Sequence, residues 1–370
     1  MRSNIAGYEW PLSGTIQIVY QTGDNRIHVL VASQDGRWRD YDITRAAGGP
    51  LLETPIITAY TWPTGRTQQI DYVSSMSNGH IHELVTLEDH PWSYEDLMDQ
   101  HTGAPPSDGI DIVGYGWEAG GTKHVVYTAA DGHIHEVSAG VSGPWRYTNL
   151  TQAAGAHQTE SRILAAYPWD VQKTRQVVYL GDDGHIHELS VGLEGSWSHQ
   201  DITSLAAAPL AEASALSAYA WQTGSTKQVV YLGANGDIYE LVAGADGQWK
   251  YSDLTALAGA PLAAGSALAG FAWETGQSKQ VVYVGNDRHV HELALEQNGQ
   301  WKHTDLTQHI HAPEAANDVI VGHEWSSQFA KHVVYLDRNS NPHIHSLLFT
   351  HGGNWKHTDL TNAAGAEPLV

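Results

Sequence analysis

Pairs of histidines spaced two residues apart recur along the chain, and most of them are followed at once by a glutamate. The segment "DDGHIHELSVG" at 182–192 shows the pattern, with His185 and His187 followed by Glu188. Alternate side chains of an extended strand lie on the same face, so the two imidazoles would point one way and the glutamate the other. Two imidazoles on one face, about 6.5–7 Å apart at the backbone, can chelate one Zn, Cu, Ni or Fe ion.

The sequence therefore predicts metal binding as one possible function, and a divalent transition metal is the one cofactor that it suggests. A closed zinc site needs four ligands and a catalytic one needs three plus water, so a neighbouring strand or turn would have to supply more. Alternatively, the imidazoles are structural and hydrogen-bond as donor and acceptor. The candidate metal ligands are His80, His82, His133, His135, His185, His187, His289, His291, His343 and His345.

The glutamates form a second candidate site on the opposite face of the same strand. One hairpin register would place them opposite residues of the preceding strand: Gln176, Gln228, Gln280 and His124. A carboxylate beside an amide and a tryptophan plane suits the recognition of sugar hydroxyls and of the apolar sugar face. The alternative is a solvated carboxylate at a sheet edge. The candidate ligand-binding glutamates are Glu83, Glu136, Glu188, Glu240 and Glu292.

Tryptophan positions show how the chain is organised. All 14 tryptophans fall into two series, and neighbouring members of a series are 52 to 55 residues apart. The first series is Trp10, Trp62, Trp117, Trp169, Trp221, Trp273 and Trp325. The second is Trp38, Trp92, Trp145, Trp197, Trp249, Trp301 and Trp355. The chain thus contains seven copies of one unit, and we expect the indole rings to supply packing between copies.

Each copy contains four short strands. In residues 215–261, the β-rich segments "ALSAYAW", "KQVVYLG", "IYELVAG" and "WKYSDLT" are separated by turns rich in Gly, Asn and Asp. Four such strands form an antiparallel meander, and a period of about 50 residues is typical of a β-propeller blade. No 3.6-residue period extends beyond the Ala-rich connectors.

The predicted fold class is all-β: one seven-bladed β-propeller with four-stranded antiparallel blades and pseudo-sevenfold symmetry. We expect a single domain over 1–370, without a strand exchanged at the closure of the ring, and small first-strand residues along the channel. The approximate blades are 1–50, 51–105, 106–157, 158–209, 210–261, 262–313 and 314–370.

The unit "W…KQVVYLGxxGxIxEL…GxW…DLT" resembles the repeats of the fucose-specific lectin propellers of fungi and of related seven-bladed bacterial lectins, over the whole chain. In the fungal lectins each site is typically formed between blades by a second-strand Arg, the Glu of "IxE" and an aromatic residue. The resemblance implies that the glutamates above and the second tryptophan series bind a glycan. The Arg position holds glutamine or histidine here, which removes a charged bidentate donor. The resemblance therefore implies a lectin-like propeller rather than a fucose lectin. The residues at that position are Gln69, His124, Gln176, Gln228, Gln280 and His332.

Composition excludes several other functions. The 41 acidic and 19 basic residues give a net charge of −22, which repels nucleic acid and anionic membranes. Without cysteine the chain can form neither a disulfide nor a thiolate metal site. We expect a cytoplasmic protein because no signal peptide or membrane span is apparent, with leaderless secretion as the alternative.

The first functional hypothesis is a multivalent protein that binds glycans or glycoconjugates between its blades, since seven near-copies would give avidity. The alternatives are a metal-binding propeller, a structural scaffold or a recruited enzyme. The sequence contains no nucleophile elbow, Walker loop or His-Glu-x-x-His helix, so it predicts no catalytic residue.

Overall fold

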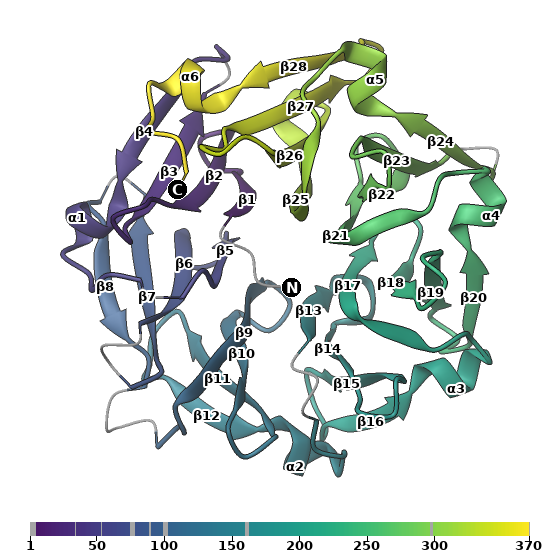
Figure 1. Ribbon diagram of the computed structural model, residues 1–370. Coiled ribbons are helices and arrows are strands. Elements are labelled where there is room, and N and C mark those ends of the chain that lie inside the picture. Colours follow the sequence, from purple (N-terminus) through teal and green to yellow (C-terminus); the bar gives the residue numbers. More distant parts are fainter. Residues whose placement is uncertain are drawn as a thin grey trace.

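A computed structural model describes residues 5–33, 35–52, 54–74, 78–88, 90–98, 103–159, 163–296 and 299–369. Within these ranges the chain forms seven four-stranded antiparallel sheets, each built from four consecutive strands. The sheets surround a central channel as the blades of a wheel (Figure 1). The predicted all-β, seven-bladed propeller is confirmed, and we number the blades 1 to 7 in chain order.

Equivalent strands occupy equivalent radial positions in every blade. The first strands, nearest the channel, are β1 (Ile5–Trp10), β5 (Ile57–Trp62), β9 (Ser107–Trp117), β13 (Leu164–Trp169), β17 (Ala211–Trp221), β21 (Ala263–Trp273) and β25 (Ala315–Trp325). The second strands are β2 (Thr15–Gln21), β6 (Thr67–Ser74), β10 (Thr122–Ala129), β14 (Thr174–Leu180), β18 (Thr226–Gly233), β22 (Ser278–Gly285) and β26 (Ala330–Asp337). The third strands are β3 (Ile27–Ala32), β7 (His80–Leu87), β11 (Ile134–Gly140), β15 (Ile186–Gly192), β19 (Ile238–Gly244), β23 (Val290–Leu295) and β27 (Ile344–Thr350). The outer strands are β4 (Trp38–Asp42), β8 (Ser93–Asp96), β12 (Arg146–Asn149), β16 (Ser198–Asp201), β20 (Trp249–Asp253), β24 (Trp301–Asp305) and β28 (Trp355–Asp359).

The Ala-rich connectors form single-turn helices on the outer rim of the wheel (Figure 1). In α4, Asp253 caps the amino end by accepting a hydrogen bond from the Ala256 amide, and Gly259 ends the helix at a φ of 60°. Such a helix also contacts the outer strand of the following blade, as α3 does with β20, and so links neighbouring blades. The helices are α1 (Ile43–Ala47), α2 (Leu150–Ala154), α3 (Ile202–Ala206), α4 (Leu254–Ala258), α5 (Leu306–Ile310) and α6 (Leu360–Ala364). Two 3-10 turns, η2 (Asp170–Gln172) and η3 (Ser326–Gln328), join first and second strands.

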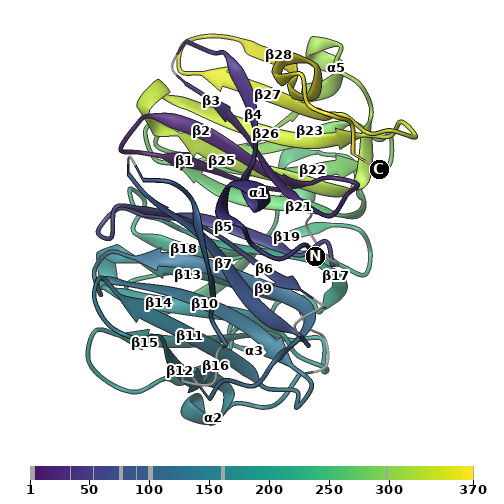
Figure 2. The ribbon, with the colours of Figure 1, turned by 90° about the vertical axis from the view of Figure 1, so that its left-hand side faces the viewer.

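The core of the protein lies between the blades, whose sheets stack face to face (Figure 2). One cluster joins Val178 of blade 4 to Tyr231 and Leu241 of blade 5. The ring closes in the same way, because Tyr20 of blade 1 packs in one cluster with Val334 of blade 7 and with Leu369. Both faces of a blade are therefore buried, so a polar side chain on either face needs a partner within the protein.

Tyrosines of the second strands connect five of the blades to the segment that precedes each of them. Tyr231 is fully buried and its hydroxyl donates a hydrogen bond to the Pro209 carbonyl oxygen, at 2.8 Å. Tyr72, Tyr127, Tyr283 and Tyr335 make the equivalent bond. In these five blades the bond fixes the preceding connector against the blade. Within the described residues, no helix has the length and apolar character needed to cross a bilayer.

Four tryptophans of the first series pack on a glycine in the following turn, and this gives a first prediction: Trp62, Trp117, Trp221 and Trp273. A Cβ added to Gly224 would lie 2.2 Å from Cε3 of Trp221. We therefore expect Gly224→Ala to destabilise the protein by about 1–3 kcal/mol, measured by thermal unfolding. At Gly244 a Cβ would meet nothing closer than 3.6 Å. Gly244→Ala should therefore leave the melting temperature nearly unchanged, and equal effects at the two sites would contradict this interpretation.

Candidate functional site in the clefts between blades

The five glutamates predicted to bind a ligand are buried between blades and ion-paired. Glu188 is 1% exposed, and both of its carboxylate oxygens accept hydrogen bonds from Lys227 Nζ of the next blade, at 2.7 and 2.6 Å. The alternative of a solvated edge carboxylate is therefore wrong for these residues. The equivalent pairs are Glu83 with Lys123, Glu136 with Arg175, Glu240 with Lys279, and Glu292 with Lys331.

The hairpin register explains this geometry. Val178 is the cross-strand partner of Glu188, which places Gln176 two residues away on the same face. Tyr179 is the partner of His187, so the histidine lies on the other face, as predicted. The glutamine or histidine column thus faces the same cleft as the glutamate, while the cation comes from the next blade.

Sequence reasoning missed this cation column, although the sequence contains a signal for it. Where a blade has the glutamate, the next blade has Lys or Arg after the first residue of its second strand. Blade 1 has Val29 at the glutamate position, and the next blade, blade 2, has Gln68 at the cation position. Blade 7 has Ser346 at the glutamate position. Its neighbour across the closure of the ring, blade 1, has Ile16 at the cation position. Acid and cation thus occur together or are absent together, which indicates contact between successive copies.

Both tryptophan series meet around the cation. Lys227 Nζ lies 5.7 Å from the ring centroid of Trp169 in blade 4 and 4.9 Å from that of Trp249 in blade 5. These distances are typical of cation–π contacts. Outer-strand tryptophans make the same contact in the other charged clefts: Lys123 with Trp145, Arg175 with Trp197, Lys279 with Trp301, and Lys331 with Trp355.

Three polar atoms of this cleft are buried without a hydrogen-bond partner among the described residues. They are the Tyr167 hydroxyl, the Trp169 indole nitrogen and Oε1 of Gln176. Gln176 uses its amide nitrogen to donate to Oγ1 of Thr174, at 2.7 Å, so the oxygen remains available. An unmet buried donor or acceptor is costly unless water or a ligand satisfies it. In other clefts the equivalent tryptophan, glutamine and tyrosine atoms also lack a hydrogen bond that meets the geometric limits: those of Tyr60, Trp62, Gln69, Trp117, Tyr219, Trp221, Gln228, Trp273 and Gln280.

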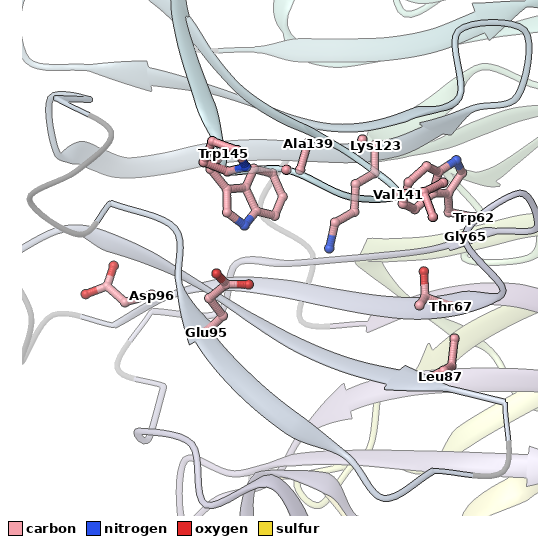
Figure 3. A pocket seen from close by; sticks show the side chains of 13 residues that line it. Trp62, Gly65, Thr67, Leu87, Glu95, Asp96, Lys123, Ala139, Val141 and Trp145 are labelled. Carbon is pink, nitrogen blue, oxygen red and sulfur yellow. The ribbon is translucent and has the colours of Figure 1, made fainter.

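Hollows occur at equivalent places in several clefts. The one between blades 2 and 3 has a volume of about 730 Å³ and is lined by Trp62, Lys123 and Trp145 (Figure 3). The one between blades 6 and 7 has about 570 Å³ and includes Trp273 and Lys331. A third, between blades 3 and 4, has about 390 Å³. Such volumes suit small ligands.

Burial and the paired cation act on the glutamates in opposite directions. Burial raises the pKa of Glu188 and of Glu240, although the lysine partner opposes it. Burial also acts to raise the pKa of Glu136, but His124 and Arg175 outweigh it, so that this pKa is lowered. The Glu136 carboxylate in the blade 3–4 cleft is therefore more firmly ionised than Glu188 and Glu240.

Two clefts lack the ion pair and differ in chemistry. Between blades 1 and 2, Trp92 and Gln68 line a hollow of about 370 Å³, and the Tyr8 hydroxyl is hydrogen-bonded to Gln17. Between blades 7 and 1, Trp38 stacks on His332, with the two ring centroids 6.1 Å apart. These two clefts are natural controls for the charged ones.

The histidine pairs lie on the other face, and their two rings are on the same side, as predicted. Ring centroids within a pair are 6.4 Å apart for His185 and His187. His185 Nδ1 is 2.7 Å from Oδ2 of Asp201, the residue that caps α3. The same contact joins His80 to Asp96, His289 to Asp305 and His343 to Asp359. His133, whose capping residue is Asn149, contacts Gln158 instead.

Four of the second histidines also have protein partners at their ring nitrogens. His187 Nδ1 is 3.0 Å from Nε2 of His199, and its Nε2 is 3.4 Å from Asp183. His82 packs against Tyr72, with ring centroids 5.6 Å apart and ring planes tilted by 34°. The remaining second histidines have equivalent partners: His135 with Tyr147 and Asp131, His291 with His303 and Asp287, and His345 with His357 and Asp337.

Metal binding by the pairs stays a prediction. Within the described part of the chain, three potential ligand atoms converge within 4.8 Å at Asp287, His289 and Asp305. This cluster is partly exposed and contains one histidine of a predicted pair rather than both.

Known structures with the same architecture include a lectin from Burkholderia pseudomallei, BP39L. The similarity covers 100% of this chain and 99% of the lectin, with a TM-score of 0.73 and 13% sequence identity. The chain shares its fold with this lectin. No family model and no curated protein matches it.

Other lectin propellers are less similar. The Aleuria aurantia lectin, solved in complex with α-methyl-L-fucoside, has a TM-score of 0.53 and 16% identity over 82% of this chain and 93% of its own. AofleA from Arthrobotrys oligospora has a TM-score of 0.53 and 13% identity over 96% of this chain and 86% of its own. At these identities the likeness concerns the fold. The Aleuria lectin is described as six-bladed, so the present chain has one blade more.

Proposed function

We propose that this protein binds glycans in the clefts between its blades and that it is multivalent. The observation that carries the proposal is the recurrence, in the clefts between blades 2 and 3, 3 and 4, and 6 and 7, of a hollow lined by tryptophan beside a cation that pairs with a buried glutamate. The Aleuria lectin with its bound fucoside supports a sugar as the class of ligand.

The groups in a cleft match the two sides of a sugar. A half-buried outer tryptophan such as Trp355 offers a ring face for the apolar side of a pyranose. Lys331 has three N–H donors, of which Glu292 takes one, and the others can donate to sugar hydroxyls. The unpartnered Gln280 oxygen is an acceptor for the same hydroxyls, and the Trp273 indole N–H is a donor.

Multivalency follows from repetition of the site. Five clefts carry the ion pair, so a surface that displays many copies of one glycan could engage several clefts at once. Linked weak sites of this kind gain avidity that a single cleft lacks.

The test begins with a glycan array and continues with calorimetry on the best glycan. Trp355→Ala should lower the number of sites per chain by one, because the blade 6–7 cleft loses its stacking surface. Trp38→Ala is the matched control: its cleft lacks the ion pair, so the stoichiometry should not change. An array without hits, together with no glycan-induced rise in melting temperature, would refute the proposal.

A further inference from the structure

Blade 2 carries three carboxylates in register on one face. Asp71 on β6 is the cross-strand partner of Glu83 on β7, and Glu83 is the partner of Glu95 on β8. Like charges directly opposite one another destabilise a sheet. No other blade has this arrangement, because the residues at the Asp71 position are Val19, Val126, Val178, Val230, Val282 and Val334.

Asp71 and Glu83 are both 0% exposed, and their negative charge is incompletely compensated. Lys123 Nζ donates to Oε2 of Glu83, at 2.5 Å. Among the described residues, Oε1 of Glu83 has no hydrogen-bond partner. The neighbouring Tyr60 hydroxyl lies beside the Asp71 carboxylate and interacts with it. If all three carboxylates are ionised, they leave a net charge of −2 against the single ammonium.

These oxygens lie in the cleft between blades 2 and 3. A Cβ added to Gly114 of blade 3 would be 2.7 Å from Oδ2 of Asp71, so this side chain reaches across to the neighbouring blade. Glu95 and Lys123 also line the hollow of about 730 Å³, where Figure 3 shows the Glu95 carboxylate on the side facing Lys123 and Trp145. Asp71 and Glu83 therefore lie in the interior of the cleft, and Glu95 lies at the hollow.

We propose that Asp71 and Glu83 bind one hard divalent cation of the Ca²⁺ class, with the Tyr60 hydroxyl beside them and Glu95 toward the opening. Carboxylate and hydroxyl oxygens are the ligands that Ca²⁺ prefers, and water from the hollow can complete its shell. A divalent charge would neutralise the residual −2 of the cluster. Oε1 of Glu83 is free for the ion while Oε2 keeps its bond to Lys123.

The competing explanation is a single proton shared by the two acids. Burial and the nearby Glu83 charge raise the pKa of Asp71 well above its usual range. A cation and a proton can therefore occupy the same place, and they are distinguished by a titration with Ca²⁺ alone. The cation site does not depend on glycan binding, so either proposal can fail without the other.

The experiment uses the full chain, treated with a chelator and titrated with Ca²⁺ at pH 7.5 by calorimetry. We expect one Ca²⁺ per chain and, at about 100 times the dissociation constant, a rise in melting temperature of about 3 °C. Asp71→Val should abolish both effects. It should still fold, because the other blades have valine at this position. Without calcium it should melt above the wild type, since a buried charge has gone.

Glu194→Gln, which removes one exposed carboxylate, is the matched control and should keep the calcium response. Tb³⁺ provides a second readout, because Tyr60 and Trp62 can sensitise its emission and Asp71→Val should remove that emission. Calcium binding that survives in Asp71→Val would overturn the assignment. A wild-type protein indifferent to Ca²⁺ would also overturn it and leave the shared proton as the explanation.

Discussion

Lys227→Met should lower the free energy of unfolding by about 3–5 kcal/mol, because it leaves the Glu188 carboxylate buried without a counter-charge. Both partners are almost fully shielded from water, with side-chain exposures of 9% and 1%. Thermal unfolding by calorimetry is the measurement, and the expected result is a clear fall in melting temperature at pH 7.

Two further variants separate the ion pair from general damage to the cleft. In Glu188→Gln/Lys227→Met both charges are absent. Most of the lost stability should return, because no charge is then buried away from water. Arg338→Met removes one partner of an exposed pair with Glu314 and should cost less than about 1 kcal/mol. A double variant as unstable as Lys227→Met would contradict the ion-pair explanation.

Acidification should destabilise the protein through the blade 7–1 cleft, where neutral histidines replace the ion pair. His332 Nδ1 is 3.2 Å from Nε2 of His323, and its Nε2 contacts the Ser346 hydroxyl. Burial lowers the pKa of His323 to about 3 and that of His332 well below its usual value of 6.5. The unfolded chain therefore binds protons at these residues at a pH where the folded chain does not.

The direction of the effect follows from proton linkage. The stability that these two histidines contribute is fully present above pH 6.5 and is lost as the pH falls below that value toward the folded-state pKa. Each such histidine adds a slope of about 1.4 kcal/mol per pH unit within its window. His289 acts in the opposite direction, because its hydrogen bond to Asp305 raises its pKa.

Melting temperatures between pH 7.5 and 5 test this prediction. His323→Tyr places at this position the tyrosine found in blade 4 as Tyr167, and it should flatten the pH dependence. His309→Gln removes an exposed histidine of α5 and should leave the slope unchanged. Identical slopes for the wild type and His323→Tyr would show that the acid sensitivity arises elsewhere.

The sequence predicted the architecture because the length and strand content of a repeat identify the structural unit that is repeated. Tryptophans at intervals of 52 to 55 residues, with turn residues between short β-rich segments, leave little besides a seven-bladed propeller. The period of two along a strand also placed His185 and His187 on one side and Glu188 on the other, as the register confirms.

The partner of Glu188 could not be predicted from periodicity alone. Lys227 is 39 residues away and belongs to another sheet, so the pairing depends on how two blades stack. The local pattern treats a glutamate in a strand as a surface residue, whereas both faces of a blade are covered by neighbours. The partners of the paired histidines also could not be predicted from periodicity: His185 contacts Asp201 and His187 contacts His199, both on the outer strand of the same blade.

The amino-acid sequence by itself determined the number of blades, the order of strands and the face on which each repeated side chain lies, because these depend on local periodicity and turn chemistry. Only the tertiary structure decided which charges meet, that five glutamates are buried beside cations, and that Asp71 and Glu83 share a cleft with one lysine. Those outcomes depend on contacts between sheets, where burial converts an ordinary polar residue into one that must be paired, protonated or bound to a ligand.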